Sequence, residues 1–201
     1  MGYYIRLLSP ADRCVPFAEL QASLAADAPP AILAVDAGSE TDWEQLALSH
    51  PDGTEIAVVE RNPVTEGSLG AEELRELQNE IAACAPASAV GWLTDYFPRI
   101  RSIYAFQLLS GTEVEGGWEI LGALKNALWE RSTGIFQADG EGFSNEEGYH
   151  ILWQFSDSVS GSWWMGVLQD GSWVHFEMDL GNPDHRQAFF KGQVPQGAKR
   201  A

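Results

Sequence analysis

Hydrophobic and polar residues alternate along this chain in short runs whose period changes from one segment to the next. A period of two predicts a strand with one buried face, and a period of three to four predicts a helix. Strand-like runs occur at residues 3–8, 31–36, 43–49, 55–61 and 103–109. Helical spacing occurs at residues 17–26, 71–83, 88–97 and 118–130. This order favours an α+β fold, with helices packed on mainly antiparallel sheets.

The segment from Gly134 to Gly181 contains four further strand-like runs and four of the eight tryptophans. Its two Asp-Gly pairs are typical turn sequences. A last helix is predicted directly after it, because Asn182 suits the N-cap and Pro183 suits the first helical position. Residues 193–201 contain proline, glycine and basic residues, and they are expected to be loose.

Two stretches of the chain resemble each other in the same order. Residues 3–9 (YYIRLLS) are similar to residues 104–110 (YAFQLLS). Residues 52–60 (DGTEIAVVE) are similar to residues 170–178 (DGSWVHFEM) at a larger offset, which predicts an inserted hairpin in the second copy. An internal duplication would give two similar strand-helix-antiparallel-strand halves. Chance similarity between short strand-turn-strand segments is the alternative.

The repeat suggests a division of the 201 residues into two halves. The first half is predicted at residues 1–100, with the helices at 71–83 and 88–97 bridging to the second. The second half is predicted at residues 101–192 with the extra hairpin, and residues 193–201 form the tail. A chain of this length can bury one large core or two smaller ones.

Acidic residues strongly outnumber basic ones. The chain has 29 Asp and Glu against 12 Lys and Arg, and its formal net charge is −17. Nucleic acids and anionic membranes attract proteins through Lys and Arg, so neither is expected as a partner. The same charge would accelerate encounter with a basic protein, which is the partner class we predict. The alternative is that the charge only maintains solubility.

The two cysteines, Cys14 and Cys84, are too few for a disulfide framework and lack metal-site spacing. Reduced thiols and a cytoplasmic location are therefore expected. No apolar run approaches the length of a membrane span, and the first residues do not look like a signal peptide. The chain lacks a phosphate loop and a dinucleotide fingerprint, so no cofactor is predicted.

One predicted strand carries the residue types of a chemical site. Alternation places His175, Glu177 and Asp179 on one face. A histidine and two carboxylates can bind a divalent metal or supply a general base, so these three are the catalytic and metal-ligand candidates. A strand with one solvent-facing side gives the same alternation without any function. No metal site is predicted, because the sequence does not place converging ligands from other segments.

The segment 139–148 is rich in glycine and acidic residues. A calcium loop requires an oxygen ligand at its fifth position and glycine at its sixth, where this segment has Phe143 and Ser144. We interpret it as a glycine-rich acidic hairpin or a wide loop, and either form can offer a contact surface. Trp163 and Trp164 must point to opposite faces of their strand, so one is expected in the core. The other faces either a covering helix or solvent, and if it is exposed it joins a binding patch. The predicted binding residues are Asp139, Glu141, Phe143, Tyr149, Trp164 and Trp173.

These features support two main hypotheses of function. The first is a non-enzymatic acidic protein that binds another macromolecule, for example an immunity or antitoxin-like protein that neutralises a basic toxin. The alternative is a metal-assisted hydrolase that uses the His175, Glu177 and Asp179 face. A small-molecule site between the repeat halves is a third hypothesis.

Overall fold

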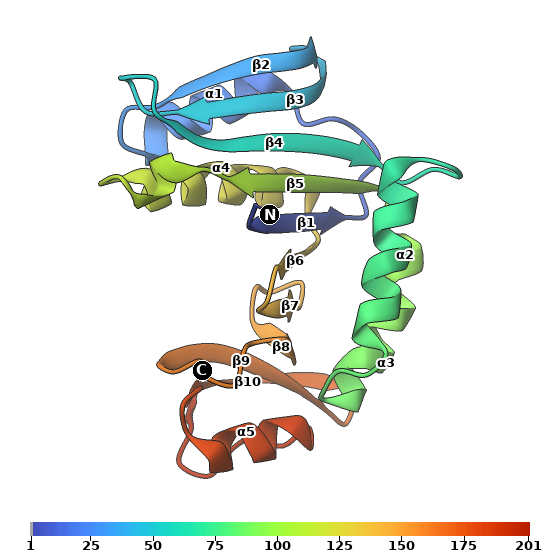
Figure 1. Cartoon of the computed structure of the whole chain (residues 1–201). Coiled ribbons are helices and arrows are strands. Elements are labelled where there is room, and N and C mark those ends of the chain that lie inside the picture. The colour runs from blue at the N-terminus through green and yellow to red at the C-terminus, as the bar shows by residue number, and fades with distance from the viewer. Residues whose placement is uncertain (1) are drawn as a thin grey trace. The chain divides into compact units, whose positions relative to one another are not determined.

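The computed structural model describes residues 2–201, in which five α-helices and eleven strands occur (Figure 1). The strands pair in a mixed, mostly antiparallel pattern, which confirms the predicted α+β class. The chain divides into two compact units. Unit 1 combines residues 1–71 with 100–134, and unit 2 combines residues 72–99 with 135–201. An internal duplication stays a prediction.

Unit 1 is an antiparallel sheet with two helices. Its strands are β1 (Tyr4–Ser9), β2 (Ile32–Ser39), β3 (Asp42–Ser49), β4 (Glu55–Pro63) and β5 (Ser102–Leu108). They pair in the order β1-β5-β4-β3-β2. The helices α1 (Phe17–Asp27) and α4 (Gly117–Ser132) lie on the same face of the sheet (Figure 1), and the short 3-10 turn η2 (Ser110–Glu113) precedes α4.

The core of unit 1 follows from the period-two pattern of its strands. Register places Leu46, Val59, Phe106 and Ile5 side by side across β3, β4, β5 and β1, and all four are buried. Trp43 is also fully buried, and its indole Nε1 donates to the carbonyl of Val15 over 2.8 Å. Buried apolar side chains on α1 and α4 complete this core.

Unit 2 contains most of α2 (Leu69–Ile81), α3 (Ala87–Tyr96) with the 3-10 turn η1 (Phe97–Arg99), and α5 (Pro183–Phe190). Its strands are β6 (Ile135–Ala138), β7 (Gly142–Ser144), β8 (His150–Trp153), β9 (Ser162–Gln169), β10 (Ser172–Asp179) and β11 (Lys199–Arg200). They follow one another in sequence order across the sheet. The β8–β9 pair is parallel, and the other pairs are antiparallel.

The region between Gly134 and Gly181 holds five strands rather than the four predicted. The additional strand is β7, whose three residues lie inside the segment interpreted as a hairpin or a wide loop, and it pairs antiparallel with β6. Gly142 permits its pairing with β8, because a Cβ there would lie 2.0 Å from the carbonyl oxygen of Leu152. The C-terminal residues, expected to be loose, end in β11, which pairs with β10.

The strand β10 has one apolar face, as its alternation predicts. Phe176, Met178 and Leu180 are buried and pack with Phe189 of α5 in one apolar cluster. The predicted start of α5 is confirmed, since the Asn182 side chain accepts hydrogen bonds from two backbone N–H groups of the first turn. The helix α5 therefore covers this face of β9 and β10 (Figure 1).

Candidate functional site

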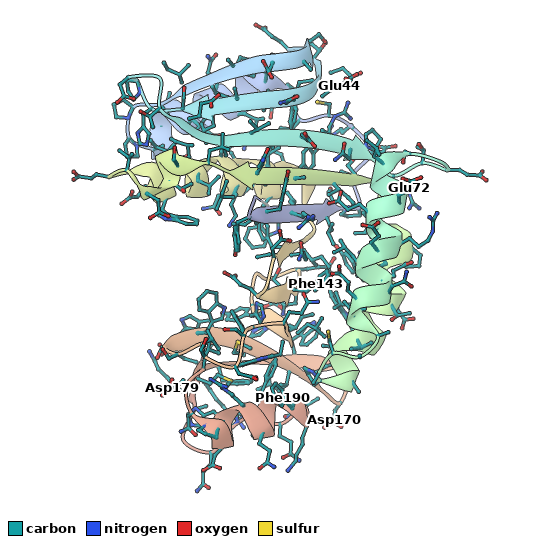
Figure 2. The ribbon with its side chains drawn as sticks, viewed as in Figure 1. Glu44, Glu72, Phe143, Asp170, Asp179 and Phe190 are labelled. Carbon is teal, nitrogen blue, oxygen red and sulfur yellow. The ribbon has the colours of Figure 1, made fainter. Side chains whose placement is uncertain are left out.

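The opposite face of β9 and β10 carries aromatic and charged side chains. Trp164 of β9 lies opposite Glu177 of β10 in the antiparallel register. Successive side chains of a strand point to opposite faces, so Trp173, His175 and Glu177 lie on the face away from Phe176. Asp170, in the turn between the strands, and Asp179, at the last residue of β10, mark the two ends of this strand in Figure 2.

The turn from Asn145 to Tyr149 lies on this face. The ring of Tyr149 stacks on the imidazole of His175, with centroids 3.7 Å apart and planes inclined by 7°. Asn145 is fully buried and fixes the turn. Its Oδ1 accepts hydrogen bonds from the backbone N–H groups of Glu147, over 3.1 Å, and of Tyr149, over 2.9 Å. One buried amide thus positions both side chains next to His175.

The same amide determines how the His175 ring is used. Because two backbone N–H groups identify Oδ1 of Asn145 as the acceptor, its Nδ2 is the group that faces His175 Nε2 at 3.0 Å. That nitrogen therefore accepts, and Nδ1 carries the proton. Nδ1 lies 3.7 Å from a carboxylate oxygen of Glu147. Both ring nitrogens consequently face protein groups.

Trp164 and Glu177 hold a cation. The Nζ of Lys199 lies 5.6 Å from the centroid of the Trp164 ring and 4.0 Å from Oε2 of Glu177. Trp164 is 40% exposed, and the edge of its ring system meets Tyr149 at 6.1 Å between centroids. An ammonium within about 6 Å of an indole centroid is attracted by the negative face of the ring. This corner of the face therefore has the chemistry to bind Lys or Arg.

A second group of aromatic rings lies at the other end of the face. Trp92 of α3 meets Trp173 edge-on at 5.3 Å and stacks on Tyr96 at 4.9 Å. The Arg99 guanidinium lies 4.5 Å from the Tyr96 ring and 3.3 Å from Glu146. Burial, with the nearby Glu146 carboxylate, raises the pKa of the Tyr96 phenol.

Of the predicted binding residues, Tyr149, Trp164 and Trp173 belong to this face, whereas Phe143 is fully buried with its ring 5.8 Å from that of Phe97. Asp139 lies in the turn between β6 and β7, and Glu141 directly precedes β7. The backbone carbonyl of Glu141 accepts hydrogen bonds from the backbone of Gln154 and from the ring of His150.

The three catalytic and metal-ligand candidates have separate partners. His175 contacts Asn145, Tyr149 and Glu147, and Glu177 pairs with Lys199. Asp179 accepts a hydrogen bond from the N–H of Gly181 and its own N–H donates to His185. Among residues 2–201, no group of three or more His, Cys, Asp or Glu side chains is placed to hold a metal ion.

Both tryptophans of the Trp163-Trp164 pair are exposed, by 39% and 40%. The expectation that one of them lies in the core is wrong. Trp163 is on the α5 side of the sheet, but it is near the beginning of β9, beyond the fully buried part of the cluster. Its ring packs against Phe155 at 5.4 Å and against the His150 ring at 6.4 Å between centroids.

Sequence reasoning missed Asn145 and Glu147. The segment Asn-Glu-Glu-Gly is a typical turn, in which an Asn side chain often bonds to the backbone two residues on. That local bond exists here, between Asn145 and the N–H of Glu147. The contact with His175 joins residues 30 positions apart, and no local pattern marks it.

Comparison with models of known protein families, with curated proteins and with solved structures gives no match for this chain. Within residues 2–201, no helix has the length and apolar character needed to cross a membrane.

Proposed function

We propose that this chain binds a basic protein through unit 2. The binding surface is the acidic aromatic face, which we define as Glu147, Tyr149, Trp164, Trp173 and Glu177. The observation that carries the proposal is the position of Lys199, whose ammonium lies over Trp164 and beside Glu177. A Lys or Arg of a partner could make the same contacts with the Trp164 ring and the Glu177 carboxylate.

Charge supports the same class of partner. Unit 2 contains fourteen acidic and six basic residues, and the whole chain has a formal net charge of −17. A field of this sign accelerates association with a positively charged protein and weakens as salt is added. Long-range attraction therefore brings the partner to the chain, and short-range contacts on the face select it.

The energies of the local contacts set a requirement on the partner. An exposed cation–π contact contributes about 0.5–1 kcal/mol, and an exposed ion pair about 0.2–1 kcal/mol. One partner lysine therefore does not suffice for stable binding. Tryptophan and tyrosine are the residues that most often dominate binding energy at interfaces, so Trp164, Tyr149 and Trp173 are the proposed anchors.

The face is also preorganised. Asn145 fixes the turn that carries Glu147 and Tyr149, and Tyr149 is stacked on His175. Side chains that are already ordered lose less conformational entropy when a partner binds. The role is non-enzymatic, and an immunity or antitoxin-like protein that neutralises a basic toxin is its most concrete form.

The test compares two double variants of the immobilised full chain. Trp164→Ala with Glu177→Gln removes the ring and the charge that hold Lys199. Trp118→Ala with Glu119→Gln makes the same changes on α4 of unit 1, where Trp118 is also exposed. Proteins retained from a host lysate are identified, purified and titrated calorimetrically at low and high salt.

We expect a basic protein to bind the unchanged chain and the Trp118 variant equally. Its affinity should fall about ten-fold with the Trp164 variant, since the loss of both contacts amounts to about 0.7–2 kcal/mol and about 1.4 kcal/mol corresponds to ten-fold. Affinity should also fall as salt is raised. The proposal is wrong if only acidic or uncharged proteins are retained, or if both double variants lose affinity to the same extent.

A further inference from the structure

The outer edge of β10 is covered over a small part of its length. All eight residues of β10 pair with β9 on one side. On the other side, β11 pairs only with Phe176 and Glu177, and the N–H of Ala201 donates to the carbonyl of His175. The N–H of Asp179 donates to His185 Nδ1, which limits pairing at that end of β10. The stretch from Ser172 to Val174 extends beyond the register of β11.

The contacts that hold β11 are few. Pro195 is buried, and Val194 and Ala198 pack against the apolar cluster under α5, so the segment is anchored as far as Ala198. After Gly197, the side chain of Lys199 is 74% exposed and makes the ion pair and the ring contact described above. A strand of two residues contributes little pairing energy of its own. Residues 199–201 can therefore detach while α5 and the core of unit 2 stay folded.

We infer that β11 occupies the place of a partner strand, and that the basic partner adds an extended segment to the edge of β10 in its stead. This inference rests on the proposed function and specifies the form of the partner that the acidic aromatic face recognises. Strand addition supplies affinity through main-chain hydrogen bonds and specificity through every second side chain. Lys199 marks the position that a partner Lys or Arg takes.

The register specifies the pattern of the partner segment. In an antiparallel pair, side chains of directly opposite residues lie on the same face. Residues of the partner opposite Glu177, His175 and Trp173 would thus lie on the acidic aromatic face, at alternate positions of its segment. A basic residue opposite Glu177 is expected, with further basic or aromatic residues two and four positions along.

The test uses a fluorescein-labelled peptide with five Lys-Thr repeats, which has a basic residue at every second position. Its affinity is measured by anisotropy for the unchanged chain and for Lys199→Glu, in which Glu177 repels the substituted side chain and releases β11. Lys191→Glu is the matched control, because it makes the same change of charge on an exposed residue at the end of α5. A Lys-Thr peptide with N-methylated lysine backbones keeps the positive charge but lacks the N–H groups that would face β10, since residues opposite His175 and Glu177 are the ones that donate to this edge.

We expect Lys199→Glu to bind the Lys-Thr peptide about ten-fold more tightly than Lys191→Glu does, because no internal strand competes. Hydrogen exchange should show slower exchange at residues 172–177 when the peptide is bound. The N-methylated peptide should bind weakly and give no protection. Equal gains in the two variants, equal binding of the two peptides, no protection in β10, or no binding of the Lys-Thr peptide would each overturn strand addition. Retention of a basic protein through Trp164 and Glu177 tests the proposed function separately, because it does not require that the partner pairs with β10.

Discussion

Replacing Asn145 by alanine should destabilise unit 2 strongly, although only a small side chain is removed. The substitution removes the acceptor for the N–H groups of Glu147 and Tyr149 and the donor to His175 Nε2. Asn145 is fully buried, so water does not replace these partners freely. A typical hydrogen bond contributes about 1 kcal/mol net, and leaving a buried group unpaired costs about 1–3 kcal/mol. We expect a loss of roughly 2–4 kcal/mol in the free energy of unfolding.

Asn182→Ala is the matched control within the same unit. Asn182 Oδ1 also accepts from two backbone N–H groups, those of Asp184 and His185. It lies at the start of α5 with part of its surface in water, where the freed N–H groups can be solvated. Loss of an N-cap side chain typically costs about 0.5–2 kcal/mol. The two substitutions thus remove the same type of side chain and the same number of hydrogen bonds to backbone N–H groups, and the two positions differ in burial.

Urea unfolding monitored by tryptophan fluorescence measures both variants, and unit 2 contains five of the eight tryptophans. The reasoning requires that Asn145→Ala lowers stability more than Asn182→Ala. It also requires weaker binding of the basic partner by Asn145→Ala than by the control, measured under conditions where both are folded. If the two variants are equally stable, the hydrogen bonds of Asn145 do not have the role we assign to them.

Two further predictions concern buried groups elsewhere. Burial lowers the pKa of His150 to about 4, while its Nε2 donates to the carbonyl of Glu141. The unfolded chain gains this proton near pH 6.5, so the free energy of unfolding should be greatest above that pH and fall towards about pH 4. His150→Gln should flatten this decline in urea titrations, and an unchanged slope would contradict the assignment. Gly111→Ala should destabilise unit 1 by roughly 1–3 kcal/mol, because a Cβ there would lie 2.4 Å from the carbonyl oxygen of Glu55. Gly122→Ala, in open space on α4, should instead stabilise it by roughly 0.5–1 kcal/mol. A melting temperature of Gly111→Ala that does not fall would show that the backbone at Gly111 adapts, and one of Gly122→Ala that falls would contradict the expectation for that position.

Local patterns in the sequence were sufficient to find most elements of the fold. The helical spacing of apolar residues locates α1 and α4 closely, and Asn182 with Pro183 locates the beginning of α5. A strand of three residues such as β7 is too short to show a period of two. Each unit consists of two separate segments of the chain. In unit 1 the segments are joined because β5 pairs with both β1 and β4, and no local sequence pattern predicts pairing between such distant residues.

The candidate site was predictable only where a local sequence pattern marks its residues. Alternation along β10 placed His175 and Glu177 on one face, and the adjacent tryptophans identified Trp164 as a binding candidate. Phe143 was chosen because it lies in an acidic segment, yet its aromatic ring is buried as apolar side chains usually are. Lys199 was missed because a segment with glycine and proline appeared loose, whereas two backbone pairs and one carboxylate hold it.

The surroundings of His175 favour recognition over proton transfer as the use of this face. A general base needs a ring nitrogen within hydrogen-bond reach of the proton that it removes. Here Nε2 accepts from Asn145, Nδ1 faces Glu147, and Tyr149 covers one side of the ring. Freeing either nitrogen would break contacts that also hold Glu147 and Tyr149 in place. Binding a basic segment leaves all of them intact, because Trp164 and Glu177 already hold an ammonium without any movement of His175.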